Sequence, residues 1–78
     1  MSAIKELYDE LGKQDASFVL GVHHNTLYKW YLFETGRQGG RNPNNAAIHL
    51  AEILMYLKRD IGWSNEDLTL MSENIKDI

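Results

Sequence analysis

Apolar and small residues recur at spacings of three and four along most of this chain, which is the period of an amphipathic α-helix. The pattern is interrupted at Gly12, at Gly21, between residues 34 and 41, and at Gly62. We therefore expect five helices, spanning about residues 3–11, 13–20, 24–33, 43–60 and 65–75. The predicted fold class is all-α, a compact bundle of about five helices in a single domain.

Residues that commonly cap helices precede three of these segments. Ser2 stands before the first helix, and Asn42 followed by Pro43 marks the start of the fourth. Ser64 and Asp67 have the spacing of a capping box before the fifth helix, with Asp where Glu or Gln is usual. These residues set the helix starts that we predict.

The stretch from Lys13 to Leu32 predicts two short helices joined by a tight turn. Gly21 lies where the chain leaves the first of them, a position that often needs a positive φ. Apolar or small residues have the spacing of one buried seam between the two helices: Ala16, Ser17, Leu20, Val22, Leu27 and Trp30. A second set faces outward from the second helix: His23 at its start, then His24, Asn25, Tyr28, Lys29 and Leu32. All of these except Leu32 can hydrogen-bond or carry positive charge.

Charge is distributed unevenly along the 78 residues, although the whole chain has a net charge of −3. Residues 1–22 sum to −2 and residues 46–78 to −3, whereas residues 23–45 sum to +2. A basic face on an acidic body suits a protein that binds a specific nucleic-acid site with weak nonspecific affinity. The alternative is that a +2 segment arises by chance in a short chain.

Composition limits the chemistry and the cellular location that we expect. The chain has no cysteine, which removes disulfides and thiolate chemistry and fits a cytosolic protein. It has no apolar run of about 18 residues, and its amphipathic, acidic N-terminus lacks the apolar segment of a secretion signal. We therefore expect a cytoplasmic protein with no membrane partner, no cofactor and no small-molecule ligand.

The residues Leu20-Gly21-Val22, followed by Thr26-Leu27 and Trp30, resemble the helix-turn-helix of small phage repressors of the Cro and Xre type. The run from Asn42-Pro43 to Ile48-His49-Leu50-Ala51-Glu52-Ile53-Leu54 resembles that family's fourth helix, and the resemblance covers about residues 13 to 57. It implies a sequence-specific transcriptional regulator that binds double-stranded DNA through its second motif helix. A phage or mobile-element repressor on a palindromic operator is the function that we expect.

The connection from Phe33 to Arg41 is longer and richer in glycine than in most such repressors. In this respect it resembles the small anti-CRISPR-associated regulators of phages and mobile elements. A MerR-like pattern also matches the motif residues; it would be followed by a wing, for which residues 37–41 are the candidate. Arg37 and Arg41 suit a phosphate-binding loop or an arm in the minor groove. The alternative is a mobile surface loop.

Four residues of the second motif helix are candidates for reading bases. Asn25 can form two hydrogen bonds with adenine, and Lys29 can donate to guanine or to a phosphate. His24 can donate to a base acceptor, and Tyr28 can reach a phosphate or pack on a thymine methyl group. An exposed helix face always carries polar residues, so the position of these four in a helix-turn-helix pattern is what makes them informative.

Lys13 and Gln14 begin the helix before the turn. The resembling family directs a Gln and backbone amides at a phosphate there, and Lys13 falls in the place of that Gln. The alternative is that both side chains are simply solvated. The candidate DNA-binding residues are therefore Lys13, Gln14, His23, His24, Asn25, Tyr28, Lys29, Arg37 and Arg41.

One helix-turn-helix contacts one half-site, so we expect a homodimer. The fourth expected helix is apolar nearly all round, and such a helix is either central or faces a partner as well. The candidates for the dimer interface are Met55, Tyr56, Trp63, Leu68, Met71 and Ile75. The alternative is that the fifth helix only covers the core.

Metal and enzyme chemistry are not expected. His23 and His24 would point about 100° apart on a helix, and neither they nor His49 have an HExxH spacing. Glu66 and Asp67 are explained by the first turn of a helix, where negative charge is favourable. The competing function is a protein-binding module on a helix-turn-helix scaffold, which the pI of about 5.5 favours. An antitoxin-like regulator that binds both DNA and a protein lies between the two.

Overall fold

A computed structural model describes residues 3–76. Within that range the chain forms five α-helices and no strand: α1 (Ala3–Leu11), α2 (Lys13–Leu20), α3 (His24–Glu34), α4 (Asn45–Tyr56) and α5 (Asn65–Lys76). A π-helical turn, η1 (Leu57–Ile61), continues α4. The predicted all-α bundle of about five helices is confirmed, and the expected Ser2 cap lies outside the described residues.

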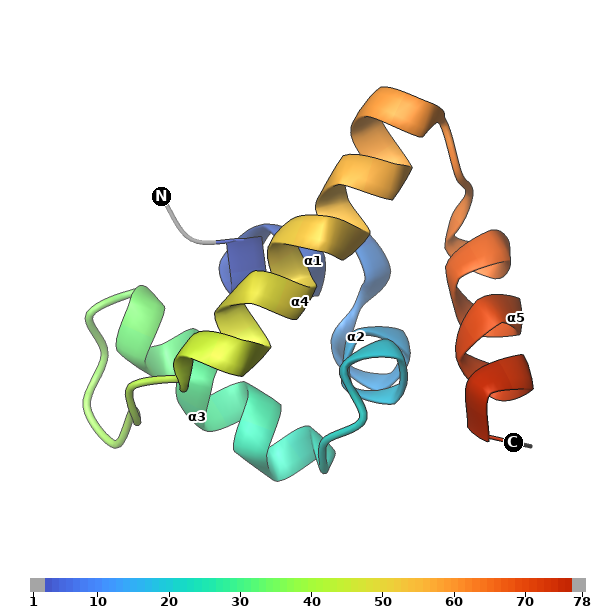
Figure 1. Ribbon diagram of the computed structural model, residues 1–78. Helices are drawn as coiled ribbons and strands as arrows, with labels where there is room; N and C mark the ends of the chain where they lie inside the picture. Colours follow the sequence, from blue (N-terminus) through green and yellow to red (C-terminus); the bar gives the residue numbers. More distant parts are fainter. Residues whose placement is uncertain (1–2, 77–78) are drawn as a thin grey trace.

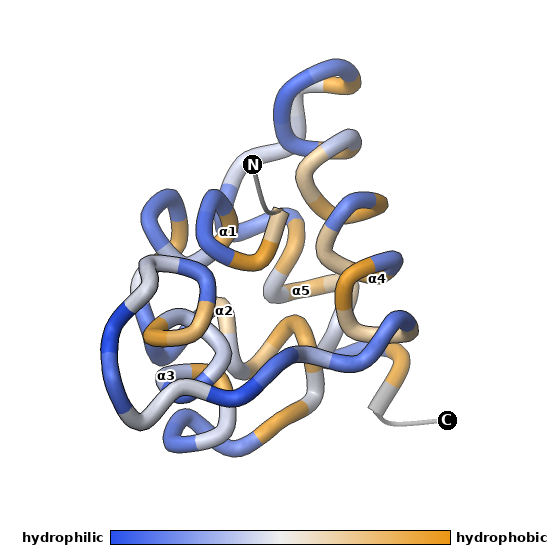
Figure 2. Tube along the Cα trace, turned by 90° about the vertical axis from the view of Figure 1, so that its left-hand side faces the viewer, coloured by the Kyte–Doolittle hydropathy of each residue, from blue (hydrophilic) through white to orange (hydrophobic). Residues whose placement is uncertain are grey.

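The first four helices surround one core, and α5 lies at its edge. α1 contacts α2, α3 and α4, whereas α5 packs mainly against α2 (Figure 1). Hydrophobic and hydrophilic residues alternate along the helices, and the connection between α3 and α4 is hydrophilic along most of its length (Figure 2). No helix within residues 3–76 is long and apolar enough to cross a membrane.

All five helices contribute buried apolar side chains to the core. These are Ile4, Leu7, Leu11, Ala16, Val19, Leu20, Leu27, Trp30, Ala51, Leu54, Met55 and Leu68. The seam predicted between α2 and α3 is among them, with Ser17 also buried and Val22 half-buried. The Ser17 hydroxyl donates to the Gln14 carbonyl at 2.8 Å, so this small polar residue lies at the helix crossing with its donor satisfied.

The helix caps agree with the prediction at α5 and differ at α4. The Ser64 amide donates to Asp67 Oδ2 at 2.9 Å, and the Asp67 amide donates to Ser64 Oγ at 3.1 Å. This is the reciprocal pair of a capping box. At α4 the prediction of an Asn42 cap is wrong, because Asn44 Oδ1 accepts from the Ala47 amide at 2.8 Å. The helix therefore begins after a buried Pro43 rather than at it.

Two of the six residues proposed for a dimer interface are not on the surface. Met55 is 5% exposed and Leu68 is 0% exposed, and both belong to the core. Their assignment to a dimer interface is wrong, because an apolar side chain that fills the protein's own core has no surface to offer. Trp63 and Met71 are half-buried against the core, whereas Tyr56 and Ile75 are exposed.

Candidate nucleic-acid interface

The turn between α2 and α3 fixes the angle at which α3 leaves the bundle. Gly21 has φ 71°, as its position after α2 predicts. Its amide donates to the Phe18 carbonyl at 3.2 Å, and the Val22 amide donates to the Ser17 carbonyl at 3.1 Å. These bonds satisfy two of the last four carbonyls of α2. The two helices can then pack together along the predicted seam.

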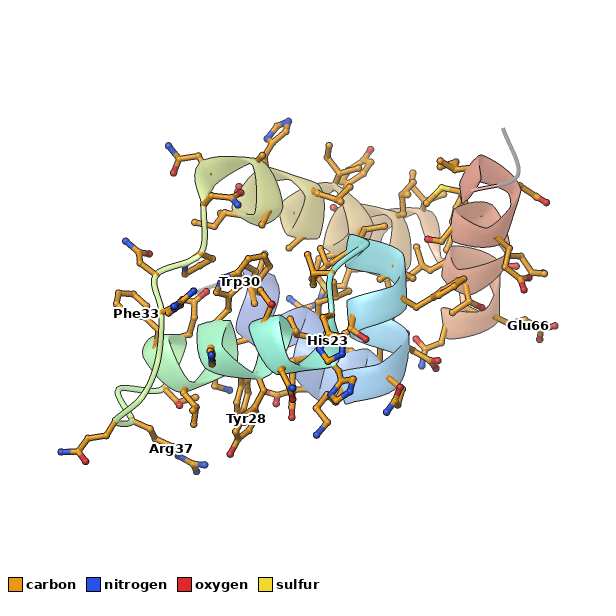
Figure 3. All side chains as sticks on the ribbon, turned by 90° about the horizontal axis from the view of Figure 1, so that it is seen from below. His23, Tyr28, Trp30, Phe33, Arg37 and Glu66 are labelled. Atoms are coloured by element: carbon orange, nitrogen blue, oxygen red, sulfur yellow. The ribbon has the colours of Figure 1, made fainter. Side chains whose placement is uncertain are left out.

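Two apolar residues hold α3 from behind, and polar residues face away from the bundle. Leu27 is 0% and Trp30 is 7% exposed. Trp30 leaves α3 on the side of α4, whereas Tyr28 and Arg37 point to the other side (Figure 3). Asn25 and Lys29 are exposed, in keeping with their position on this helix. The structure therefore brings three of the four predicted base-reading residues onto one accessible face: Asn25, Tyr28 and Lys29.

His24, the fourth of these residues, lies at the edge of that face. It is half-buried, and its Nδ1 is buried without a hydrogen-bond partner among the described residues. Its ring stacks on the ring of His23, with 4.2 Å between the centroids and 30° between the planes. His23 caps α3, because its Nδ1 accepts from the Asn25 amide at 3.2 Å. The two histidines therefore shape the start of the helix more than they extend its outer face.

The start of α2 lies beside the outer face of α3. Lys13 and Gln14 are both exposed, and Lys13 Nζ lies 5.6 Å from the centroid of the Tyr28 ring. This distance is that of a cation–π contact. The N-cap of α2, Gly12, offers no side-chain acceptor to the first amides of the helix. Lys13, one of the two predicted phosphate-contacting residues of α2, is thus in contact with the predicted base-reading helix.

The glycine-rich connection is held against α3 rather than extending away from it. The Arg37 amide donates to the Leu32 carbonyl at 2.8 Å, and the Arg41 amide donates to the Lys29 carbonyl at 3.0 Å. A Cβ placed on Gly40 would overlap the Phe33 backbone nitrogen and lie 2.5 Å from the Phe33 Cα. Only glycine therefore allows this approach. Both arginine side chains are exposed next to the helix.

The cations of this region do not form ion pairs with described residues. The three ion pairs between described side chains join Lys5 to Asp9 and Arg59 to Glu6 and Glu10, at 2.7, 3.0 and 3.9 Å. They lie on α1 and η1. Lys29, Arg37 and Arg41 are outside this set. Their charges are therefore not neutralised by a described carboxylate, and each can approach a phosphate.

Two further exposed residues of α3, Thr26 and Phe33, are not among the predicted DNA-binding residues. Phe33 is 47% exposed and lies seven residues after Thr26, on the same side of the helix. The helical period that placed Asn25 and Lys29 on the outside also places these two there. Leu32, which precedes Phe33, was predicted to face outward and is half-buried.

Within the described part of the chain, no three His, Cys, Asp or Glu side chains gather where they could hold a metal ion. No protein-family model matches this chain, and the comparisons with curated proteins and with solved structures found no match either. A functional assignment therefore depends on the geometry of α3 and its surroundings.

Proposed function

We propose that this protein is a sequence-specific DNA-binding regulator that places α3 in the major groove. The observation that carries the proposal is the arrangement of α3 itself. Leu27 and Trp30 anchor it, while Asn25, Tyr28 and Lys29 lie on its accessible side. The major groove, about 12 Å wide, admits an α-helix and displays a distinct pattern of donors and acceptors for each base pair.

The surrounding cations would hold the helix in register on the duplex. Lys13 at the start of α2 lies against Tyr28, and the two arginines belong to the connection whose backbone is bonded to α3 at Leu32 and Lys29. Contacts of this kind fix orientation without reading sequence. The rest of the chain is acidic, with a net charge of −3 overall. That balance would keep nonspecific affinity low and leave discrimination to α3.

A homodimer on a two-fold symmetric operator is the assembly that fits this proposal. Two copies of α3 would then contact half-sites about one DNA turn apart, roughly 34 Å. The resemblance of the motif to small phage repressors supports repression of a phage or mobile-element promoter. Light scattering after size-exclusion chromatography, with and without the operator, measures the stoichiometry.

The decisive experiment is selection of bound duplexes from a random pool, followed by binding of the selected site. We expect a two-fold symmetric motif. Asn25→Ala should weaken binding by about 1–3 kcal/mol and relax preference at one base pair. Asn74→Ala, which removes an exposed Asn from α5, is the matched control and should bind like the parent protein. Equal affinity of all three proteins for the site would contradict the role of Asn25.

A salt titration tests the phosphate contacts separately. Arg37→Ala and Arg41→Ala should each weaken binding to all sequences alike and lower the slope of log K against log salt by about 0.9. Arg59→Ala removes the same charge from η1, where the guanidinium pairs with Glu6 and Glu10. We expect this control to leave the slope unchanged.

A protein-interaction module is the second candidate function. It is favoured by six exposed apolar side chains on α4, η1 and α5: Leu50, Ile53, Tyr56, Ile61, Leu70 and Ile75. Contiguous patches of exposed apolar residues on a small protein are common at interaction surfaces. A selection that returns no motif, together with a protein that binds duplexes only weakly and without preference, would favour this second function.

A further inference from the structure

The cap of α3 is chemically unusual. Ser, Thr, Asp and Asn are the side chains that most often accept a hydrogen bond at a helix N-cap. Here the acceptor is an imidazole nitrogen, Nδ1 of His23, and the donor is the backbone amide of Asn25 at 3.2 Å. An imidazole nitrogen accepts a hydrogen bond only when it carries no proton, so this cap needs the neutral ring with its proton on Nε2. Asn25 is the residue proposed above to read a base.

We propose that His23 is a positioning residue for Asn25 and that protonation of its ring lowers the sequence preference of the protein. This inference rests on the proposed function. Once Nδ1 is protonated, it becomes a donor facing the donor amide of Asn25, and the cap is lost. The new positive charge also stands at the positive end of the α3 dipole. The first turn, which carries Asn25, then loses the contact that holds it in place.

The groups around His23 do not compensate for a proton on its ring. A hollow of about 370 Å³ beside the turn is lined by Gln14, Ser17, Phe18, Gly21, Val22, His23 and His24. The histidines are its only titratable residues, and their rings stack at 4.2 Å. Lys13 and Asp15 flank Gln14 in the first turn of α2, and among described residues neither forms an ion pair with a histidine ring. Lys13 instead faces the Tyr28 ring.

Protonation should weaken specific contacts but strengthen nonspecific binding, and this difference makes the inference testable. A cation at the start of α3 attracts phosphates of any sequence, so nonspecific affinity should rise as pH falls. Loss of the cap acts only on contacts that depend on the position of Asn25. The ratio of specific to nonspecific affinity therefore isolates the positioning effect. Imidazoles change charge between about pH 5 and pH 8, which sets the range to be measured.

The test compares the selected duplex with a scrambled duplex at about pH 7.5 and about pH 5.5. For the parent protein we expect the affinity ratio to fall about five- to tenfold on acidification, the size of a lost helix cap. His23→Asn supplies an acceptor that does not titrate, and its ratio should hold at both pH values. His23→Ala has no cap, and its ratio should be low at both.

His24→Gln is the matched control, since it removes the neighbouring imidazole and keeps the cap. It should retain the pH dependence of the parent protein. If His23→Asn loses specificity on acidification as steeply as the parent protein does, or if His24→Gln abolishes the dependence, the assignment to His23 is overturned.

A measurement without DNA separates this inference from the proposed function. In ¹⁵N NMR of the free protein, His23 should carry its proton on Nε2, and the Asn25 amide signal should follow the titration of the His23 ring. In His23→Asn the Asn25 signal should stay in place. An amide that follows the ring in a protein without specific DNA binding would overturn the proposed function and leave the cap standing. An Asn25 signal that ignores the ring would overturn the inference alone.

Discussion

α3 and α5 are helices of nearly equal length that are attached to the bundle in a similar way. α3 has 11 residues and α5 has 12. Each is anchored by a leucine that is 0% exposed, Leu27 in α3 and Leu68 in α5. Their exposed sides differ mainly in charge. α3 offers Asn, Thr, Tyr, Lys and Phe, whereas α5 offers three carboxylates, one Asn and two large apolar residues, Leu70 and Ile75.

The comparison shows that packing alone does not distinguish the proposed recognition helix from a covering helix. Both helices bury one face, and both have a cap that satisfies a backbone amide. What separates them is the chemistry of the outer face and the way that neighbouring segments support it. α3 is flanked by Lys13 and by the connection that leads from α3 to α4, whereas α5 packs mainly against α2.

The anchors should differ in how much of the fold depends on them. Leu27→Ala should lower the free energy of unfolding by about 3–4 kcal/mol, because it opens a cavity where α1, α2 and α3 meet. Leu68→Ala should cost less, about 2–3 kcal/mol, since α5 lies at the edge of the bundle. Urea unfolding followed by circular dichroism measures both. Leu70→Ala, on the exposed side of α5, is the control and should change stability by less than about 0.5 kcal/mol. A larger loss for Leu68→Ala than for Leu27→Ala would make α5 the more central helix.

The anchors of α3 could be predicted from the sequence, because Leu27 and Trp30 have helical spacing and every residue between them is polar or partly polar. The same rule did not identify the buried side of α4. Apolar residues surround that helix, so the sequence shows no single face, and Met55 was placed outside although it belongs to the core. Leu68 was misassigned for a related reason: α5 has several apolar residues, and spacing alone does not say which of them meets α2.

The connection between α3 and α4 is expected to give the next largest effect. Gly40→Ala should cost about 2–3 kcal/mol, because the new methyl group would overlap the backbone of α3 at Phe33. Gly36 has φ 74° and open space around its Cβ position, so Gly36→Ala should cost only its backbone strain, about 1 kcal/mol. Thermal unfolding of the two variants gives the comparison. Equal melting temperatures would mean that the connection does not rest on α3.

This contact also marks a limit of sequence analysis. The glycines of the connection were recognised as permissive residues, and an arm, a wing and a mobile loop were all compatible with them. The sequence does not indicate which glycine approaches another backbone, because that depends on where the chain returns. The caps show the same limit. Asn42, Asn44 and Asn45 are all suitable caps for α4, and only the fold selects Asn44. At α3 the cap is a histidine, a residue that sequence rules do not propose.

The two caps should differ in strength and in their response to pH. Ser64→Ala removes half of the capping box of α5 and should lower the free energy of unfolding by about 1 kcal/mol. Ser64→Thr keeps the hydroxyl acceptor and is the control. Neither Ser64 nor Thr titrates, so the difference between the two variants should be the same at about pH 7.5 and about pH 5.5. A pH-dependent difference would show that a group titrating between these two pH values acts on the contact made by the Ser64 hydroxyl.

The smallest effect concerns the one carboxylate that α3 carries. Glu34 lies at the C-terminal end of the helix beside a hollow of about 710 Å³ that also includes Glu6 and Glu52. Burial raises the pKa of Glu34, so its ionisation is less favourable in the folded chain than in the unfolded chain. The raised pKa therefore makes a contribution to the free energy of unfolding that is fully present below the ordinary glutamate pKa of about 4.3. This contribution is lost as pH rises through the raised pKa.

Glu34→Gln should consequently raise the urea midpoint at about pH 7, where the parent side chain is ionised, and the gain should vanish at about pH 4. Glu73→Gln, at an exposed position of α5, is the matched control and should not show this pH-dependent gain. If Glu34→Gln instead lowers the urea midpoint at neutral pH, the contacts of the carboxylate stabilise the fold by more than its burial destabilises it. The end of α3 would then be held by charge as well as by packing, and the contrast with α5 would extend from the outer face of the helix to its attachment.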